Sequence, residues 1–99
     1  MNTEPHLYMV AYDIADKKRL RRVYKTMRGF GDHMQYSVFR CVLSPMQRER
    51  MLDRLHGLIK HDEDQVIVIP LGRAGAKRSW RMTTLGLPVV QLERSVLVV

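Results

Sequence analysis

Asp13 is the residue of this 99-residue chain whose type and position best suit metal chemistry. It stands near the end of an apolar run, residues 6–14, that predicts a buried strand. A carboxylate at a strand end projects toward the rim of its sheet and can ligate a hard cation such as Mg²⁺ or Mn²⁺. A cap or turn residue is the alternative role for Asp13.

Phosphodiester hydrolysis usually needs two or more oxygen ligands around its metal, and Asp13 supplies one carboxylate. In a two-fold dimer, the Asp13 side chains of both copies could share one ion at the dimer axis. The second copy of the chain would then supply the missing ligand.

Residues 17–28 carry a dense group of basic side chains, and the only acid nearby is Asp16. Apolar residues at helical spacing in the same segment predict an amphipathic helix with Asp16 as its N-cap, so the basic side chains must project into solvent as a band. We interpret this band as a phosphate-binding surface; an ordinary solvated face is the alternative. The predicted nucleic-acid contacts are Lys17, Lys18, Arg19, Arg21, Arg22 and Lys25.

A second basic group follows near the C-terminal end, in a glycine-rich stretch that reads as an exposed loop. Trp80 lies among these basic residues, which suits stacking or cation–π contact with nucleic acid, although Trp80 could equally anchor the loop. The contacts predicted in this group are Arg73, Lys77 and Arg78.

Composition favours a polyanionic partner, because 17 Lys and Arg stand against 10 Asp and Glu for a net charge of +7. No apolar run approaches the ~20 residues of a membrane span, and no secretory signal is evident, so we expect a cytoplasmic chain without a membrane partner. Cys41 is the only cysteine, which excludes an internal disulfide. His56 and His61 are five positions apart and would diverge on a helix.

The predicted elements follow the order β-α-β(β)-α-β. Residues 34–43 alternate in polarity, so they form either one long strand or a tight hairpin. Ser44 to Gln47 form a capping box with proline at the first helical position. Glycines end the first helix, and Pro70 predicts that the last strand of the core ends there or lies at a sheet edge. The expected strands are residues 6–14, 34–43 and 65–71, and the expected helices follow Asp16 and Ser44.

Two helices on one face of a mostly antiparallel sheet predict an α+β, ferredoxin-like βαββαβ sandwich. We assign residues 1–80 to this core and residues 81–99 to a C-terminal strand segment. An exposed apolar strand is a liability, so we expect this segment to complete the sheet of a second copy in a symmetric homodimer.

Several of these motifs together resemble the CRISPR-associated Cas-two family. They are Tyr12-Asp13-Ile14, the basic helix with a glycine near its end, residues 35–39 (QYSVF) and Ile69-Pro70-Leu71. The resemblance runs from about residue 7 to residue 72. It implies a ferredoxin-like homodimer, metal-dependent endonuclease activity on single-stranded RNA or double-stranded DNA, and a position between dimers of the Cas-one integrase during spacer capture.

The resemblance also assigns roles to individual residues. Asp13 matches the metal-binding aspartate and Tyr12 its neighbouring tyrosine, and we predict that both are catalytic residues. Arg19 and Arg22 match the basic positions of the first helix, with Lys18 and Arg21 as adjacent candidates. Ser37 and Phe39 match a strand pair near the dimer interface.

Two functions are therefore expected. In the first, Mg²⁺ or Mn²⁺ on Asp13 supports phosphodiester cleavage, and Arg19 or Arg22 stabilises charge on phosphorus. In the second, the dimer is a non-catalytic scaffold that binds a duplex backbone beside the integrase. A small-ligand regulatory domain fits the topology but not the charge.

Overall fold

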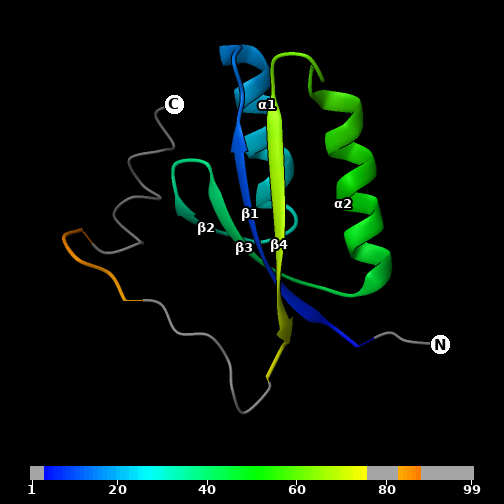
Figure 1. Ribbon diagram of the computed structural model, residues 1–99, viewed down its shortest axis with the longest axis vertical. Coiled ribbons are helices and arrows are strands. Elements are labelled where there is room, and N and C mark those ends of the chain that lie inside the picture. Colours follow the sequence, from blue (N-terminus) through cyan, green and yellow to red (C-terminus); the bar gives the residue numbers. More distant parts are fainter. Residues whose placement is uncertain (1–3, 76–82, 88–99) are drawn as a thin grey trace.

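A computed structural model describes residues 4–75 and 83–87 of the chain. Its elements follow the βαββαβ order: β1 (His6–Asp13), α1 (Lys17–Arg28), β2 (Asp32–Gln35), β3 (Val38–Leu43), α2 (Pro45–Leu58) and β4 (Gln65–Arg73). The strands form one antiparallel sheet in the order β2-β3-β1-β4, with both helices on one of its faces (Figure 1). The predicted α+β ferredoxin-like fold is confirmed.

The predicted C-terminal strand falls mainly on residues 88–99, outside the described part of the chain. The predicted domain boundary at residue 80 lies outside it as well. Residues 83–87, the described piece of the C-terminal segment, contain no strand. Within the described ranges, no helix is long and apolar enough to cross a membrane.

The core lies between the helices and the inner face of the sheet. Because side chains alternate along a strand, every second residue of β1 and β3 points toward the helices. Both helices contribute the apolar stripe that their spacing predicts. The buried cluster consists of Val10, Tyr12, Val23, Met27, Phe39, Cys41, Leu43, Met51 and Leu55.

Helix α1 begins at its predicted cap, since the Asp16 side chain accepts a hydrogen bond from the Arg19 amide at 2.9 Å. It ends at Gly29, as expected, but neither Gly29 nor Gly31 has a positive φ. Gly31 is needed for space instead: a Cβ there would lie 2.5 Å from the carbonyl oxygen of Arg40 and 2.5 Å from the sulfur of Cys41. The close approach of Gly31 to β3 therefore explains the second glycine.

Helix α2 has the predicted capping box, in which Ser44 and Gln47 bond each other's backbone amides. The helix ends at Leu58, so His61 lies beyond it in the following loop. There the His61 ring bonds the carbonyl of His56 at 3.0 Å, and the two ring centroids are 4.5 Å apart. The expectation that these histidines diverge was wrong, because it assumed a helix that continues through residue 61.

Residues 34–43 belong to a tight hairpin, the second of the two predicted forms, and its first strand begins earlier, at Asp32. Tyr36 and Ser37 form the turn. Tyr36 has φ +30°, which is uncommon for a residue other than glycine. The buried His33 ring donates from Nε2 to the Tyr36 carbonyl at 2.7 Å, and the Tyr12 amide donates to the Ser37 carbonyl at 3.1 Å. The first bond fixes the turn to β2, and the second holds it against the end of β1.

Strand β4 lies at the sheet edge, as Pro70 predicts, but it continues past Pro70 to Arg73. An edge strand tolerates proline because one side of the strand has no partner. The face of the sheet away from the helices is apolar, with Val42, Ile67 and Ile69 all more than 40% exposed. By strand register, this open face comprises Leu7, Met9, Ala11, Val38, Val42, Ile67 and Ile69, with Arg40 among them.

Candidate nucleic-acid interface

Four segments from three separate parts of the sequence meet at one end of the sheet (Figure 1). They are the end of β1 with Asp13, the start of α1, the β2–β3 turn and the loop of residues 59–64 between α2 and β4. This end therefore brings the predicted metal ligand together with the first turn of the basic helix.

Asp13 is exposed, and its carboxylate takes part in no hydrogen bond or ion pair with the described residues. It pairs with Gln65 across the sheet and, two positions after Ala11, continues the row of side chains on the open face. Its carboxylate is thus available at the rim of that face.

One chain offers few side chains that could act as ligands to a metal ion at this site. No group of three or more His, Cys, Asp or Glu side chains that could hold a metal occurs among the described residues. Mg²⁺ usually keeps several waters and binds through one or two carboxylates plus substrate phosphates. Asp13 therefore fits a partly hydrated Mg²⁺ or Mn²⁺, and does not fit an ion enclosed by ligands from one chain.

Helix α1 carries seven basic residues and no acid between Lys17 and Arg28. Successive residues turn by about 100°, so the buried side of the helix, at Val23 and Met27, fixes the direction of every other side chain. Lys18, Arg22 and Lys25 point directly away from the core. We call these three residues the α1 outer face.

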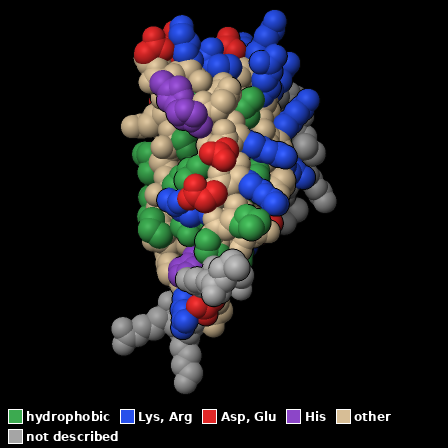
Figure 2. Space-filling view, turned by 90° about the vertical axis from the view of Figure 1, so that its right-hand side faces the viewer, with side chains coloured by type: hydrophobic (Ala, Val, Ile, Leu, Met, Phe, Trp, Pro, Cys, Tyr) green, Lys and Arg blue, Asp and Glu red, His purple; other side chains and the backbone are tan. Residues whose placement is uncertain are grey.

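The α1 outer face is not neutralised by the chain itself. Its three side chains are exposed and form no ion pair with any residue that the structure describes. In Figure 2, Lys and Arg side chains gather at the upper end and along one edge of the molecule. By contrast, α2 mixes three arginines with two acids, and its Arg48 is paired with Glu49 at 3.1 Å.

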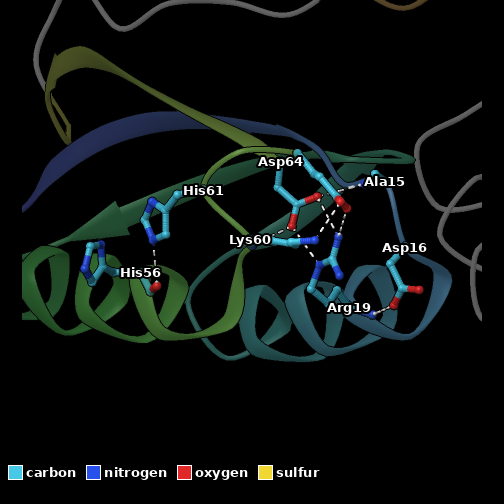
Figure 3. A network of polar contacts seen from close by, with 8 residues as sticks. Ala15, Asp16, Arg19, His56, Lys60, His61 and Asp64 are labelled. Carbon is cyan, nitrogen blue, oxygen red and sulfur yellow. Dashed lines mark hydrogen bonds and ion pairs between the residues drawn. The ribbon is translucent and has the colours of Figure 1, made fainter.

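Arg19 lies on the flank of α1 and faces the loop between α2 and β4 (Figure 3). Its Nε donates to Asp64 at 2.8 Å and its Nη2 to Glu63 at 3.0 Å. The guanidinium of Arg19 is therefore already bound to two acidic side chains of the same chain. Its predicted contact with phosphate stays a prediction, while the structure gives it a positioning role that the sequence did not indicate.

Asp64 is the centre of this network. Its side chain has 0% exposure and also accepts hydrogen bonds from the amides of Ala15 at 2.9 Å and Lys60 at 2.8 Å. The Arg19 guanidinium, followed by the two amides, holds the pKa of the Asp64 carboxyl well below its usual range. Asp64 thus connects the loop of residues 59–64 to Ala15, which lies between β1 and α1, and to Arg19 in the first turn of α1. We call this set of contacts the Asp64 network.

Sequence reasoning missed Glu63 and Asp64 as site residues. The signal available in the sequence was the acidic turn of residues 62–64 in a basic chain, which is typical of the end of a helix. The partner of Asp64 lies 45 positions away at Arg19, a distance that no local pattern reports.

Tyr12 and Phe39 both belong to the core. Tyr12 is 6% exposed and its ring stacks on that of Phe39, with centroids 6.2 Å apart. Burial, and to a lesser extent the neighbouring Tyr24, raises the pKa of Tyr12. Phe39 has 0% exposure, so its ring offers no free surface. The predicted roles of Tyr12 in catalysis and of Ser37 and Phe39 at a dimer interface stay predictions.

Arg73 lies at the opposite end of the sheet, because it pairs with His6 while Gln65 pairs with Asp13. Its guanidinium is bound to Glu4 at 2.7 Å. The structure therefore does not bring Arg73 close to Asp13. Lys77 and Arg78, predicted to act with it, lie outside the described residues.

A cavity of about 230 Å³ opens beside Asp13 on the helix side of the sheet. Its walls come from the end of β1, from α1 and from the β2–β3 turn, and they are mostly apolar and aromatic. The lining residues are Tyr12, Asp13, Ile14, Leu20, Arg21, Tyr24, Tyr36 and Ser37.

The strand order and helix placement define a ferredoxin-like α+β domain, and solved structures share it. A hypothetical protein from Thermus thermophilus superposes with a TM-score of 0.72 at 28% identity, covering 84% of this chain and 93% of that one. The Cas2 of Streptococcus pyogenes superposes with a TM-score of 0.67 at 30% identity, covering 81% of this chain and 99% of that one.

Sequence comparison identifies the family. Residues 6–79 match the family model for CRISPR associated protein Cas2. The chain is 42% identical over 94 residues to the CRISPR-associated endoribonuclease Cas2 1 of Rhodospirillum rubrum, covering 95% of this chain and 91% of that protein. It is also 44% identical over 69 residues to the CRISPR-associated endoribonuclease Cas2 of Geobacter sulfurreducens, covering 70% and 73%. The chain belongs to the Cas2 family, which confirms the resemblance in its motifs.

Proposed function

We propose that two copies of this chain bind a nucleic-acid backbone along α1 and cleave its phosphodiester bonds with a divalent cation held at Asp13. The observation that carries the proposal is the exposed Asp13 at the end of β1, close to a helix with a positively charged outer face; neither Asp13 nor that face has an ionic partner among the described residues. The endoribonuclease names of two relatives support cleavage as the reaction.

Asp13 would hold Mg²⁺ or Mn²⁺ together with oxygens of the substrate and water. When bound, the cation acts as a Lewis acid on the phosphate and lowers the pKa of a water molecule bound to it. Arg22 binds and orients the backbone as an exposed cation, with Lys18 and Lys25 on either side. Arg19, engaged with Asp64, positions the first turn of α1 relative to Asp13.

The open face of the sheet supports a homodimer as the working form. A monomer that exposes Val42, Ile67 and Ile69 on one surface leaves apolar area in water that a second copy could cover. Asp13 continues the row of side chains on this face, so a two-fold axis passing near this end of the sheet would bring the Asp13 residues of the two copies toward each other. One ion shared at the axis then has two carboxylate ligands.

The test of cleavage uses the full chain as a purified dimer with end-labelled single-stranded RNA and, separately, a DNA duplex. We expect product with Mg²⁺ or Mn²⁺ and none with EDTA, because the proposed reaction needs the cation as Lewis acid and as the ligand of the attacking water. A dimer that yields no product with either cation between about pH 6 and pH 9, spanning the near-neutral pKa of a metal-bound water, contradicts the enzymatic proposal.

The second candidate is a non-catalytic scaffold that holds a duplex backbone beside the Cas-one integrase. The observation that favours it is the small donor set, a single carboxylate without a metal-binding group of three among the described residues. A scaffold needs only the α1 outer face and two-fold symmetry. Binding of nucleic acid in EDTA, with no cleavage when metal is restored, would identify this role.

Both candidates predict strongly salt-dependent binding. Each phosphate neutralised by the dimer should contribute about 0.7–0.9 to the slope of log K against log salt, because bound cations displace counterions. The double variant Arg22→Gln, Lys25→Gln should lower this slope by about 0.7–0.9 for each phosphate that the variant no longer neutralises. Fluorescence anisotropy from 50 to about 300 mM salt measures the slope.

The matched control is Arg50→Gln, an exposed arginine on α2, where acids are interspersed. This substitution also lowers the net positive charge, but Arg50 does not belong to the α1 outer face. The slope of log K against log salt should therefore stay near that of the wild type. Arg50→Gln matches the single variant Arg22→Gln in net charge, and an equal drop in slope for these two single variants would contradict α1 as the binding surface.

A further inference from the structure

The cavity beside Asp13 has a size and lining that suit one flat ring system. At about 230 Å³ it is smaller than the roughly 300–1,000 Å³ of pockets that take drug-sized ligands. Leu20, Ile14 and Tyr24 form apolar walls, and Asp13 and Arg21 also belong to the lining. A ligand with one aromatic ring system would match the apolar walls.

Tyr36 is the aromatic side chain of the cavity with a surface left for a ligand. Its side chain is 65% exposed, whereas Tyr12 is buried in the core. The ring of Tyr24 is packed against His33 and Phe39, with centroids 5.3 and 5.9 Å away, and its hydroxyl accepts from Arg28 at 3.0 Å.

The turn holds Tyr36 at this place despite a backbone conformation that favours glycine. A φ of +30° costs free energy for a residue with a Cβ, and such positions are found where the surroundings over-determine them, often at ligand clamps. The hydrogen bonds from His33 to the Tyr36 carbonyl and from Tyr12 to the Ser37 carbonyl provide that constraint. A large aromatic ring is therefore held, exposed, at a position where glycine would be easier to accommodate.

We propose that this cavity receives one unstacked nucleobase, which stacks on Tyr36 while its backbone passes Asp13 and the α1 outer face. This inference rests on the proposed function and adds a base-binding site to it. Stacking on an aromatic side chain suits any base, because every base has a π-face. A base inside a duplex is already stacked and paired, so the cavity selects an unpaired nucleotide next to Asp13.

The test separates base binding from backbone binding with two probes of equal length and charge. One is the oligonucleotide dT10, and the other is a ten-unit abasic DNA strand with the same phosphates. The full chain is titrated with each probe in EDTA, so that no cleavage interferes, and anisotropy measures the Kd. We expect the wild type to bind dT10 roughly 10-fold or more tightly than the abasic strand, from stacking of one base.

The variants test Tyr36 itself. Tyr36→Gly and Tyr36→Asn remove the ring and keep a residue that tolerates positive φ, so the fold should persist, as thermal unfolding will verify. In both, the preference for dT10 should fall toward one while the Kd of the abasic strand stays unchanged. Tyr36→Phe retains a stacking ring and should keep the wild-type preference.

The outcomes distinguish this inference from the proposed function. Equal binding of both probes by the wild type, or a dT10 preference that survives in Tyr36→Gly and Tyr36→Asn, overturns the base site while backbone binding stands. If the wild type binds neither probe, binding of single strands along α1 fails and the base site fails with it, while the duplex scaffold is tested by the separate measurement on a DNA duplex.

Discussion

Replacing Asp13 with asparagine is expected to abolish metal-dependent cleavage and to leave nucleic-acid binding and the melting temperature unchanged. The asparagine keeps the shape of the side chain but removes the charge that holds a divalent cation. Loss of a residue that only orients a metal ligand costs about 10–100-fold in affinity or activity, so loss of the ligand itself should exceed about 100-fold. Single-turnover cleavage of labelled RNA measures the rate.

Asp62→Asn is the matched control for this prediction. Asp62 is an exposed acid of the loop between α2 and β4, and it has no partner among the residues described. The substitution makes the same change in net charge as Asp13→Asn, so any general effect of added positive charge on binding appears in both. Cleavage by Asp13→Asn at the rate of Asp62→Asn would show that Asp13 does not hold the catalytic metal.

Replacing Asp64 with asparagine is expected to be the most destabilising of the acid-to-amide substitutions. Asparagine has one carbonyl oxygen where Asp64 uses two oxygens to accept from Arg19, Ala15 and Lys60. The substitution leaves donors without partners, and it adds an amide that must find acceptors of its own. We expect the melting temperature to fall by about 5–15 °C in a domain of this size.

Two comparisons test whether this effect belongs to the Asp64 network. Glu63→Gln removes a more exposed partner of Arg19, and Asp62→Asn removes a neighbouring acid with no such contacts, so both should change the melting temperature much less. A melting temperature for Asp64→Asn equal to that of Asp62→Asn would contradict the network as a source of stability.

The pH dependence of the free energy of unfolding should also reveal the contribution of the Asp64 carboxylate. The pKa of Asp64 is lower in the folded chain than its ordinary value of 3.8, so the folded state binds fewer protons there than the unfolded state. Its stabilisation is fully present above about pH 4 to 5 and is lost as the pH falls toward the lower, folded pKa. Urea unfolding between pH 2 and about pH 7 should therefore show a shallower acid decline for Asp64→Asn than for the wild type.

The Asp64 network also affects the position of Asp13. Asp64 binds the amide of Ala15, two residues after Asp13, and holds the first turn of α1 through Arg19. Even at a temperature where Asp64→Asn remains folded, the substitution should lower the cleavage rate. The reason is that the contacts of Asp64 no longer fix Asp13 and the first turn of α1 relative to each other. This reduction should be smaller than the loss caused by Asp13→Asn.

The sequence by itself determined the elements and the general chemistry of the site. The apolar periodicity of α1, its Asp16 cap and the capping box at Ser44 are local signals, and local signals set where helices begin. The apolar run that ends in Asp13 predicted both a central strand and the exposed carboxylate at its end. The basic band followed from the same periodicity, since burying one side of α1 directs Lys18, Arg22 and Lys25 outward.

The tertiary structure alone decided which charged groups remain available and which are used internally. Arg19 and Arg22 are alike in sequence, but packing of the loop of residues 59–64 against α1 pairs Arg19 with Asp64 and leaves the Arg22 side chain exposed. Likewise, the end of helix α2 at Leu58 brought together the His56 and His61 rings, and the turn at Tyr36 created the cavity. These contacts join residues far apart in sequence or depend on where a helix stops, so they exist only after the chain has folded.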